Sequence, residues 1–205
     1  MAGRLQAQII CFLLLSCFQF LPESCHSPTK IENSDTYITN YLRSGDIILR
    51  KSYGLVSNII AAKLKDTIDV SHCGIIYIDA NHTVYVIHSL SKAVSEKDGM
   101  QSCTLKKFMA DSRIETVQVV RFKKDSAQII GKWAHYYLLK QIPFDNNYDL
   151  KDSSAFFCTE LPIHIINKQF GINLSSGNEL PKFSIFLNPK YFDKVFFIKK
   201  ANLNH

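Results

Sequence analysis

The stretch from residue 71 to residue 90 constrains the fold most, because its pattern predicts two β-strands joined by a short turn. The runs "SHCGIIYI" (71–78) and "HTVYVIHSL" (82–90) are rich in β-branched and aromatic residues, and Asp79-Ala80-Asn81 between them is a turn signal. Asn81 suits the left-handed position that three-residue hairpin loops often need. The pattern therefore predicts a hairpin with a three-residue loop, and such a hairpin belongs to an antiparallel sheet.

Elsewhere in the chain, similar periodicities predict three helices and three more strands. Helical spacing of apolar residues covers 53–65, 125–141 and 159–171, and strand-like runs cover 44–50, 114–123 and 195–200. Asp125 and Gln128 stand at capping-box spacing at the start of the second helix, and Gly171 lies near the end of the third. The mixed order of elements predicts an α+β fold, with an antiparallel sheet packed with helices.

Length and composition predict a single globular domain. The chain has 205 residues, of which 46% are hydrophobic and 20% charged, and this balance excludes disordered and collagen-like classes. No repeat or proline- and glycine-rich linker divides the chain after residue 40, so residues 41–205 are expected to form the domain. The net charge is +6, but the lysines are scattered rather than clustered with aromatic residues. We therefore expect a monomer with no nucleic-acid partner.

The first 16 residues predict an export signal, because one arginine precedes an apolar run that is too short to span a bilayer. The motif "LLSC" (14–17) resembles the lipobox of bacterial lipoproteins, in which the cysteine is acylated. This interpretation gives a lipid-anchored cell-envelope protein whose residues 17–40 are a tether. The alternative is cleavage near Ser24, which would release the protein into the periplasm or medium.

Cysteine usage does not predict a disulfide framework. Of the six cysteines, Cys11 falls in the signal and Cys17 is the expected acylation site, and the others are widely spaced without a CxxC pair: Cys25, Cys73, Cys103 and Cys158. We expect reduced thiols, with a Cys73–Cys103 bridge left open. Cys158 itself has four interpretations, namely core filler, half of a disulfide, metal ligand or nucleophile.

Side-chain parity brings two histidines together. A three-residue loop places His72 directly opposite His88 on one face of the hairpin, with Cβ atoms about 5 Å apart. The neighbouring Cys73 points to the other face, so it cannot easily share a metal ion with His72. A metal site made of His72, His88 and Cys158 stays a minor alternative, and otherwise neither a metal nor a cofactor is expected.

The position of Cys158 gives its thiol a reason to ionise. It precedes a predicted helix, where free backbone N–H groups and a nearby imidazolium both favour a thiolate. The same N–H groups suit the oxyanion that forms when sulfur attacks a carbonyl. Pro162 lies close to this start, which indicates that the helix begins late or is kinked there.

Five segments together resemble one family. They are "GDIIL" (45–49), "SHCGIIY" (71–77), "VIHS" (86–89), "PFD" (143–145) and "FFCTEL" (156–161). In this order they resemble the YiiX-like permuted papain-fold cysteine hydrolases of the NlpC superfamily, and they are more distantly similar to lecithin:retinol acyltransferase-like proteins. The resemblance covers roughly residues 42–198.

The resemblance implies a circularly permuted papain-like fold and three site residues. Cys158 matches the nucleophile, His72 the general base and His88 the residue that orients the base. The chain departs from the family where His88 replaces a frequent glutamate, and where Phe144 and Phe157 replace tyrosines. Asp46 and Asp145 are interpreted as structural hydrogen-bonding residues.

The function expected from these features is hydrolysis of an amide or ester bond through an acyl-enzyme on Cys158. Substrates within reach of an exported enzyme are cell-wall peptides and lipids. Two alternatives stay open: an acyltransferase that passes the acyl group to a lipid or amine, and a non-catalytic binding module.

Overall fold

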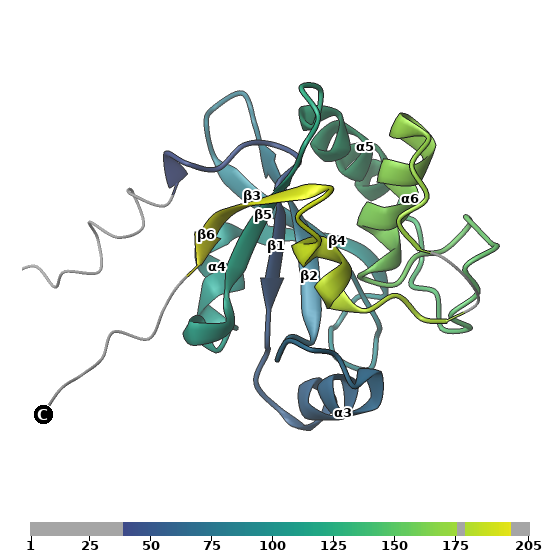
Figure 1. The fold of residues 1–205 in the computed structure, drawn as a ribbon. Helices are drawn as coiled ribbons and strands as arrows, with labels where there is room; N and C mark the ends of the chain where they lie inside the picture. Colours follow the sequence, from purple (N-terminus) through teal and green to yellow (C-terminus); the bar gives the residue numbers. More distant parts are fainter. Residues whose placement is uncertain (1–38, 176–178, 198–205) are drawn as a thin grey trace, which may run out of the picture. The chain divides into compact units, whose positions relative to one another are not determined.

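A six-stranded antiparallel sheet forms the centre of the domain (Figure 1). The computed structural model describes residues 39–175 and 179–197, and the predicted signal and nearly all of the predicted tether lie outside them. The strands, in the sheet order β4-β3-β2-β1-β5-β6, are β1 (Ile47–Arg50), β2 (His72–Ile78), β3 (Val84–Leu90), β4 (Gly99–Thr104), β5 (Gln118–Phe122) and β6 (Phe192–Phe197). The helices are α3 (Leu55–Leu64), α4 (Leu105–Ala110), α5 (Gln128–Leu139) and α6 (Glu160–Phe170), with 3-10 turns at Ile114–Thr116 and Phe183–Leu187. The predicted α+β class is confirmed.

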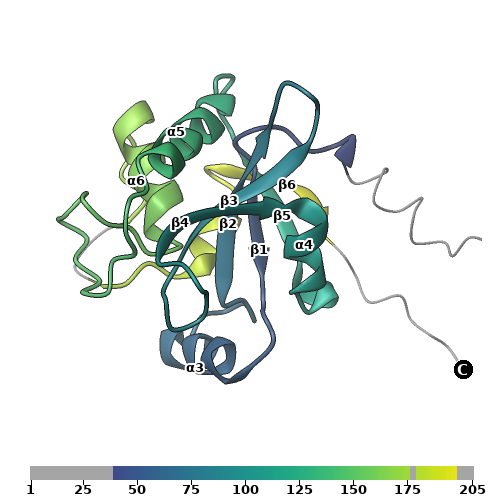
Figure 2. The ribbon, with the colours of Figure 1, turned by 180° about the vertical axis from the view of Figure 1, so that it is seen from behind.

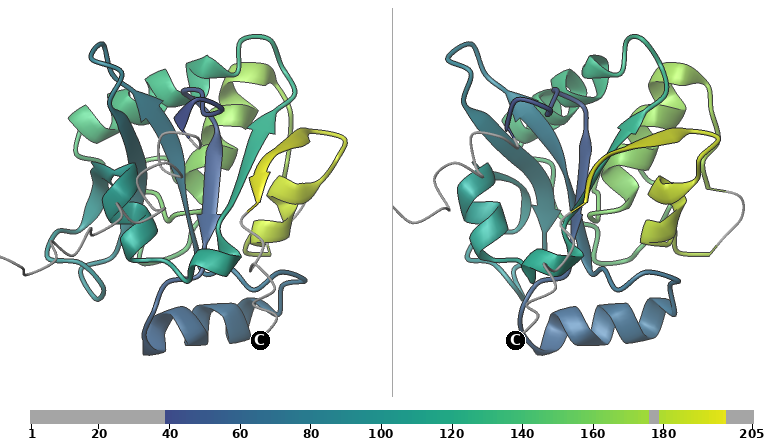
Figure 3. Two further views of the ribbon diagram at one scale, coloured as in Figure 1. Left: turned by 90° about the vertical axis from the view of Figure 1, so that its left-hand side faces the viewer. Right: turned by 60° about the vertical axis from the view of Figure 1, so that its left-hand side comes forward.

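Two hydrophobic layers enclose the sheet. Alternate residues of the central strands, such as Ile75 and Ile87, pack with α5 and α6 on one face. The intervening residues, such as Ile76 and Val86, pack with Phe108 of α4 on the other (Figure 2). Helix α3 follows β1 directly and lies across the end of the strands (Figure 3). The sheet is therefore buried on both faces, and its α3 end carries the candidate site.

The hairpin loop is longer than the sequence predicts. The pairs Ile75↔Ile87 and Ile78↔Val84 leave five residues, 79–83, in the loop. Asp79 sets this length, because its Oδ1 accepts the backbone N–H groups of Asn81 and Thr83 at 2.9 and 2.8 Å. The predicted direct opposition of His72 and His88 is therefore wrong. A shift of two residues preserves side-chain parity, so both histidines still share a face.

Three other expectations need correction. Strand β4 and helix α4 were not predicted, because "GMQSCT" and "LKKFMA" are too short and too polar to show a clear period. The predicted capping box is absent from α5, whose N-cap is Ala127 with no side-chain cap bond. Strand β6 starts three residues earlier than predicted, and residues 198–200 lie outside the described part.

Glycine in the "GDIIL" segment is explained by close packing. Gly45 has φ 96°, and a Cβ there would lie 2.2 Å from the carbonyl oxygen of Ala127. The next residue, Asp46, is buried. Its two carboxylate oxygens accept hydrogen bonds from Nε and Nη2 of Arg121, each at 2.7 Å. This segment therefore fixes β1 against α5 and β5, in keeping with the structural interpretation of Asp46.

Candidate active site

The two hairpin histidines form a direct hydrogen bond. His72 Nε2 lies 2.7 Å from His88 Nδ1, and the ring planes are inclined at 62°. Both rings are buried and pack against Phe108 of α4. Gly74 makes room for this diagonal contact, because a Cβ at that position would lie 3.3 Å from His88 Cβ and 2.4 Å from Val86 Cγ1.

Both imidazoles are neutral at physiological pH. Burial is the largest cause that lowers the pKa of His72 well below its usual range, followed by the neighbouring His88 and Arg50. Burial and then Arg50 lower the pKa of His88 to about 3. One ring nitrogen of the pair therefore donates and the other accepts. A neutral His72 can accept a proton, but it cannot act as the imidazolium that was expected to stabilise a thiolate.

Cys158 obtains its stabilisation from another thiol. The side chain of Cys73 donates a hydrogen bond that is the largest cause lowering the pKa of Cys158; burial opposes it, and backbone N–H groups of Cys73, Thr159 and Cys158 add to it. Burial raises the pKa of Cys73 well above its usual range, so this thiol keeps its proton. Cys73 Sγ also donates to the Cys158 carbonyl oxygen at 3.1 Å, so its single proton is shared between that oxygen and the Cys158 sulfur. The local environment therefore favours a thiolate at Cys158.

The structure brings the three predicted site residues to one end of β2, but it divides them between the two faces of the sheet. His72 and His88 lie on the α4 face, whereas Cys158 contacts Cys73 and packs with the opposite core layer. Within the described residues, no hydrogen bond joins the Cys158 sulfur to His72. The ring nitrogen of His72 that is not bonded to His88 is Nδ1, and this atom is the one that can serve a thiolate.

Two cavities flank these residues. One of about 490 Å³ is lined by His72 and His88, and one of about 140 Å³ is lined by Cys158 and aromatic side chains that include Phe144. Ile60 of α3 lines both cavities. The thiol and the histidine pair are therefore reached from neighbouring hollows that share one wall residue.

The start of α6 accommodates both a proline and a buried acid. Because α6 begins at Glu160, Pro162 is its third residue, where a missing N–H leaves no hydrogen bond unmade. Glu160 Oε2 accepts the backbone N–H of Phe157 at 3.2 Å. Burial raises the pKa of Glu160 to about 8, and nearby Asp145, Asp149 and Asp152 also raise it. The sequence left a late start or a kink open, and α6 begins at Glu160, one residue after the predicted start at 159.

Neither cysteine pairing nor a metal cluster is found in the described part of the chain. Cys73, Cys103 and Cys158 are free thiols, and Cys73 and Cys103 belong to opposite core layers, so the bridge left open by the sequence is not formed. No three His, Cys, Asp or Glu side chains among the described residues converge as metal ligands. None of the described helices is long and apolar enough to cross a membrane.

Sequence reasoning missed the roles of two residues of the site, Arg50 beside the histidine pair and Cys73 on the opposite face of β2. Arg50 is the β1 residue directly opposite His72 in the register, and Cys73 is the partner of the Cys158 thiol. The available signal for Arg50 was a charged residue directly after the apolar run "IIL" (47–49). The role of Cys73 depends on how α6 packs, which no local pattern reveals.

Comparison with known proteins identifies the family. Residues 41–193 match the family model described as permuted papain-like amidase enzyme, YaeF/YiiX, C92 family. No curated protein matches the chain. A solved structure, the crystal structure of metalloprotein yiiX from Escherichia coli O157:H7, shares the fold with a TM-score of 0.60 at 17% identity, covering 77% of this chain and 98% of that one. With three quarters of its length matched, the chain belongs to the YaeF/YiiX family of permuted papain-like amidases.

Proposed function

We propose that this cysteine hydrolase cleaves an amide or ester bond with Cys158 as nucleophile, His72 as general base and His88 as the residue that orients His72. The observation that carries the proposal is the 2.7 Å bond between His72 Nε2 and His88 Nδ1, because it fixes the ring of His72 and leaves Nδ1 for proton transfer. The lowered pKa of Cys158 supports its role as the attacking sulfur.

His72 takes up and releases a proton in each of the two half-reactions. Nδ1 takes the thiol proton as sulfur attacks the carbonyl, and backbone N–H groups at Cys158 and Thr159 hold the oxyanion. The imidazolium then protonates the departing amine or alcohol, which leaves an acyl group on sulfur. His72 then takes a proton from water as the water oxygen attacks the acyl carbon and forms a second oxyanion. Collapse of this oxyanion breaks the C–S bond and releases the acid, and His72 returns its proton to sulfur.

The compartment and substrate class follow from the N-terminal sequence. An export signal and the "LLSC" motif (14–17) support a cell-envelope enzyme that is anchored through Cys17 and acts on cell-wall peptides or lipids. Mass spectrometry of membrane fractions should find an acylated peptide that begins at Cys17. A soluble mature protein that begins near residue 25 would contradict the anchor and leave the chemistry unaffected.

The catalytic roles are tested by trapping the acyl-enzyme. A p-nitrophenyl ester should add one acyl group to the protein, and peptide mapping should place it on Cys158. His72→Ala should abolish the adduct and turnover, whereas His88→Ala should retain part of both, because water can replace an orienting group.

The matched control is Cys103→Ala, since Cys103 Sγ lies 3.8 Å from His88 Nε2 and is the thiol nearest the histidine pair on its own face. This variant should acylate as the unmodified protein does. Acylation of Cys103 instead of Cys158 would overturn the assignment. Release of the acyl group to an added amine rather than to water would show the transferase alternative.

A further inference from the structure

Arg50 is a buried guanidinium that the fold does not neutralise. Its side chain is 6% exposed, Nη1 donates to the carbonyl oxygen of Phe108 at 2.6 Å, and the group lies 4.0 Å over the Phe108 ring. Nε is buried and has no hydrogen-bond partner among the described residues. Buried charges in proteins are normally paired with an opposite charge, because desolvating an unpaired ion is costly.

Another arginine of this protein shows what the Arg50 edge is suited to bind. Arg121 uses Nε and Nη2 together, and each donates to one oxygen of the Asp46 carboxylate at 2.7 Å. In Arg50, Nη1 is bonded to the carbonyl oxygen of Phe108, so the Nε–Nη2 edge is the one that remains for a ligand. Within the described residues, no carboxylate lies within ion-pair distance of Arg50. Arg50 therefore lacks the partner that its fork geometry fits best.

The surrounding cavity has the polarity that an anion requires. Arg50 lines the 490 Å³ cavity together with hydroxyl groups that include Ser57 and Ser71. The one carboxylate in its lining, Asp111, is paired with Lys107 at 2.9 Å. His72 in the same lining is neutral and adds no negative charge. The cavity thus presents hydroxyl groups and a guanidinium that has no ion-pair partner among the described residues, although Asp111 acts on it at longer range.

We propose that this cavity binds a carboxylate group of the substrate on the Nε–Nη2 edge of Arg50. The inference rests on the proposed function, and it restricts the substrate to amides or esters that carry a carboxylate close to the bond that is cleaved. Proximity is set by the sheet, because Arg50 is the cross-strand partner of His72. Nε is shielded from solvent, so the two-pronged contact needs a small movement of the guanidinium.

Carboxylate binding has a consequence for the base. The charge of Arg50 contributes to lowering the pKa of both His72 and His88. A bound carboxylate offsets that charge, so it raises the pKa of the histidine pair and strengthens His72 as a proton acceptor. The substrate would then activate the base only when it is correctly seated.

The test compares two probes of similar size, N-acetylglycine and its neutral amide, N-acetylglycinamide, in which an NH2 group replaces one carboxylate oxygen. Calorimetric titration of the full chain should show saturable binding of the acid and at least about tenfold weaker binding of the amide, a difference of about 1.4 kcal/mol. Arg50→Gln should weaken acid binding by a similar factor. Arg50→Lys should retain part of the acid binding, because lysine keeps the positive charge but cannot donate two parallel hydrogen bonds to a carboxylate.

Lys106→Gln is the matched control, because it removes an exposed positive charge of α4 that does not line this cavity. It should change acid binding by less than about twofold, as expected for a charge on the solvated surface. Equal binding of the acid and the amide to the unmodified protein would overturn the proposal, and this comparison can be made even if Arg50→Gln fails to fold. An equal loss of acid binding in Lys106→Gln and Arg50→Gln would overturn it too.

Inorganic phosphate is titrated as a second ligand, because its oxygens can accept the same two hydrogen bonds from the guanidinium. Competition of phosphate with bound N-acetylglycine supports an oxyanion site at Arg50, whereas binding of phosphate alone contradicts a carboxylate site. Acyl-enzyme trapping is measured independently. Acid binding without acylation of Cys158 would contradict the proposed function only, and acylation without acid binding would contradict the carboxylate site only.

Discussion

At the scale of single residues, His72 and Cys73 are adjacent in the chain and act on different partners. His72 bonds to His88 on one face of β2, and Cys73 donates to Cys158 on the other. The strand thus delivers a base and a thiol donor from consecutive positions, because successive side chains point to opposite faces. Cys73 is the residue whose replacement separates the two effects.

Replacing Cys73 with alanine should make Cys158 less reactive. The variant removes the hydrogen bond that is the largest cause lowering the pKa of Cys158, so the thiolate fraction at pH 7 falls. We expect alkylation of Cys158 by iodoacetamide to slow by about three- to tenfold, in proportion to a rise of up to about one pKa unit. Peptide mapping of the alkylation rate between pH 5 and pH 10 measures it.

Cys103→Ala provides the control, since Cys103 does not contact Cys158 in the described structure. Its Cys158 should alkylate at the rate seen in the unmodified protein. An unchanged pH profile in Cys73→Ala would mean that backbone N–H groups alone stabilise the thiolate.

At the scale of elements, the sequence predicts which strands and helices form better than how they align. The runs 71–78 and 82–90 form a hairpin as expected, because β-branched and aromatic residues suit a buried strand. The register was missed by two residues because Asp79 holds a longer loop through side-chain bonds that no hydropathy pattern records. The prediction that His72 and His88 share one face of the sheet still holds, because a register error of two residues does not change the face to which a side chain points.

The candidate site was predictable to the same extent. The pairing of His72 with His88 follows from strand periodicity, which is local information. The contact between Cys73 and Cys158 spans 85 positions and depends on how α6 packs against β2. Arg50 joins the site through the β1–β2 register, which also depends on tertiary structure.

Gly74→Ala should destabilise the central hairpin. An added Cβ would lie 2.4 Å from Val86 Cγ1, so β2 and β3 must move apart where the histidines meet. We expect a loss of about 1–3 kcal/mol in the free energy of unfolding, as in other overpacked cores, together with reduced turnover. Urea denaturation and ester hydrolysis measure the two effects.

Gly171→Ala is the comparison. Gly171 has φ 62° with no atom within 4 Å of an added Cβ, so its cost is backbone strain of about 1 kcal/mol at the far end of α6. Turnover should persist in this variant. Normal stability and activity of Gly74→Ala would show that the hairpin has more room than the structure indicates.

At the scale of the whole molecule, Glu160 couples stability to pH. Its pKa is raised to about 8 by burial, whereas an unfolded glutamate has a pKa of about 4.3, so the folded state binds the proton more tightly. This stabilisation is fully present below about pH 4.3 and is lost as pH rises through about 8. Through this group the protein should lose up to about 4 kcal/mol between pH 5 and pH 9, because its stability falls by about 1.4 kcal/mol per pH unit between the two pKa values.

Glu160→Gln should flatten that dependence, because the amide oxygen still accepts the Phe157 N–H and carries no charge. Urea midpoints at pH 5, 7 and 9 test it. The exposed Glu115→Gln should retain the slope of the unmodified protein. A slope that persists in Glu160→Gln would assign the pH dependence to other groups.

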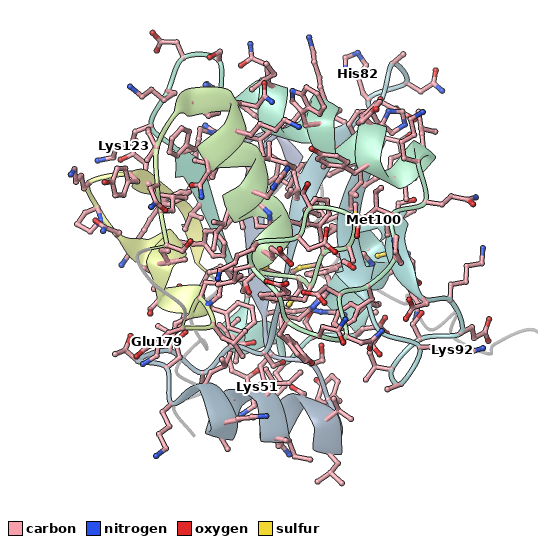
Figure 4. All side chains as sticks on the ribbon, turned by 90° about the vertical axis from the view of Figure 1, so that its right-hand side faces the viewer. Lys51, His82, Lys92, Met100, Lys123 and Glu179 are labelled. Carbon is pink, nitrogen blue, oxygen red and sulfur yellow. The ribbon has the colours of Figure 1, made fainter. Side chains whose placement is uncertain are left out.

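The two ends of the sheet have different tolerance for change. Figure 4 shows Lys51 beside α3 at one end and His82, in the hairpin loop, at the other. The loop 79–83 is largely exposed and is held by its own Asp79, and its residues do not line the cavities of His72 and Cys158. Insertions at this tip are therefore remote from the chemistry, which makes it the place to attach a fluorophore or a surface tether to a working enzyme.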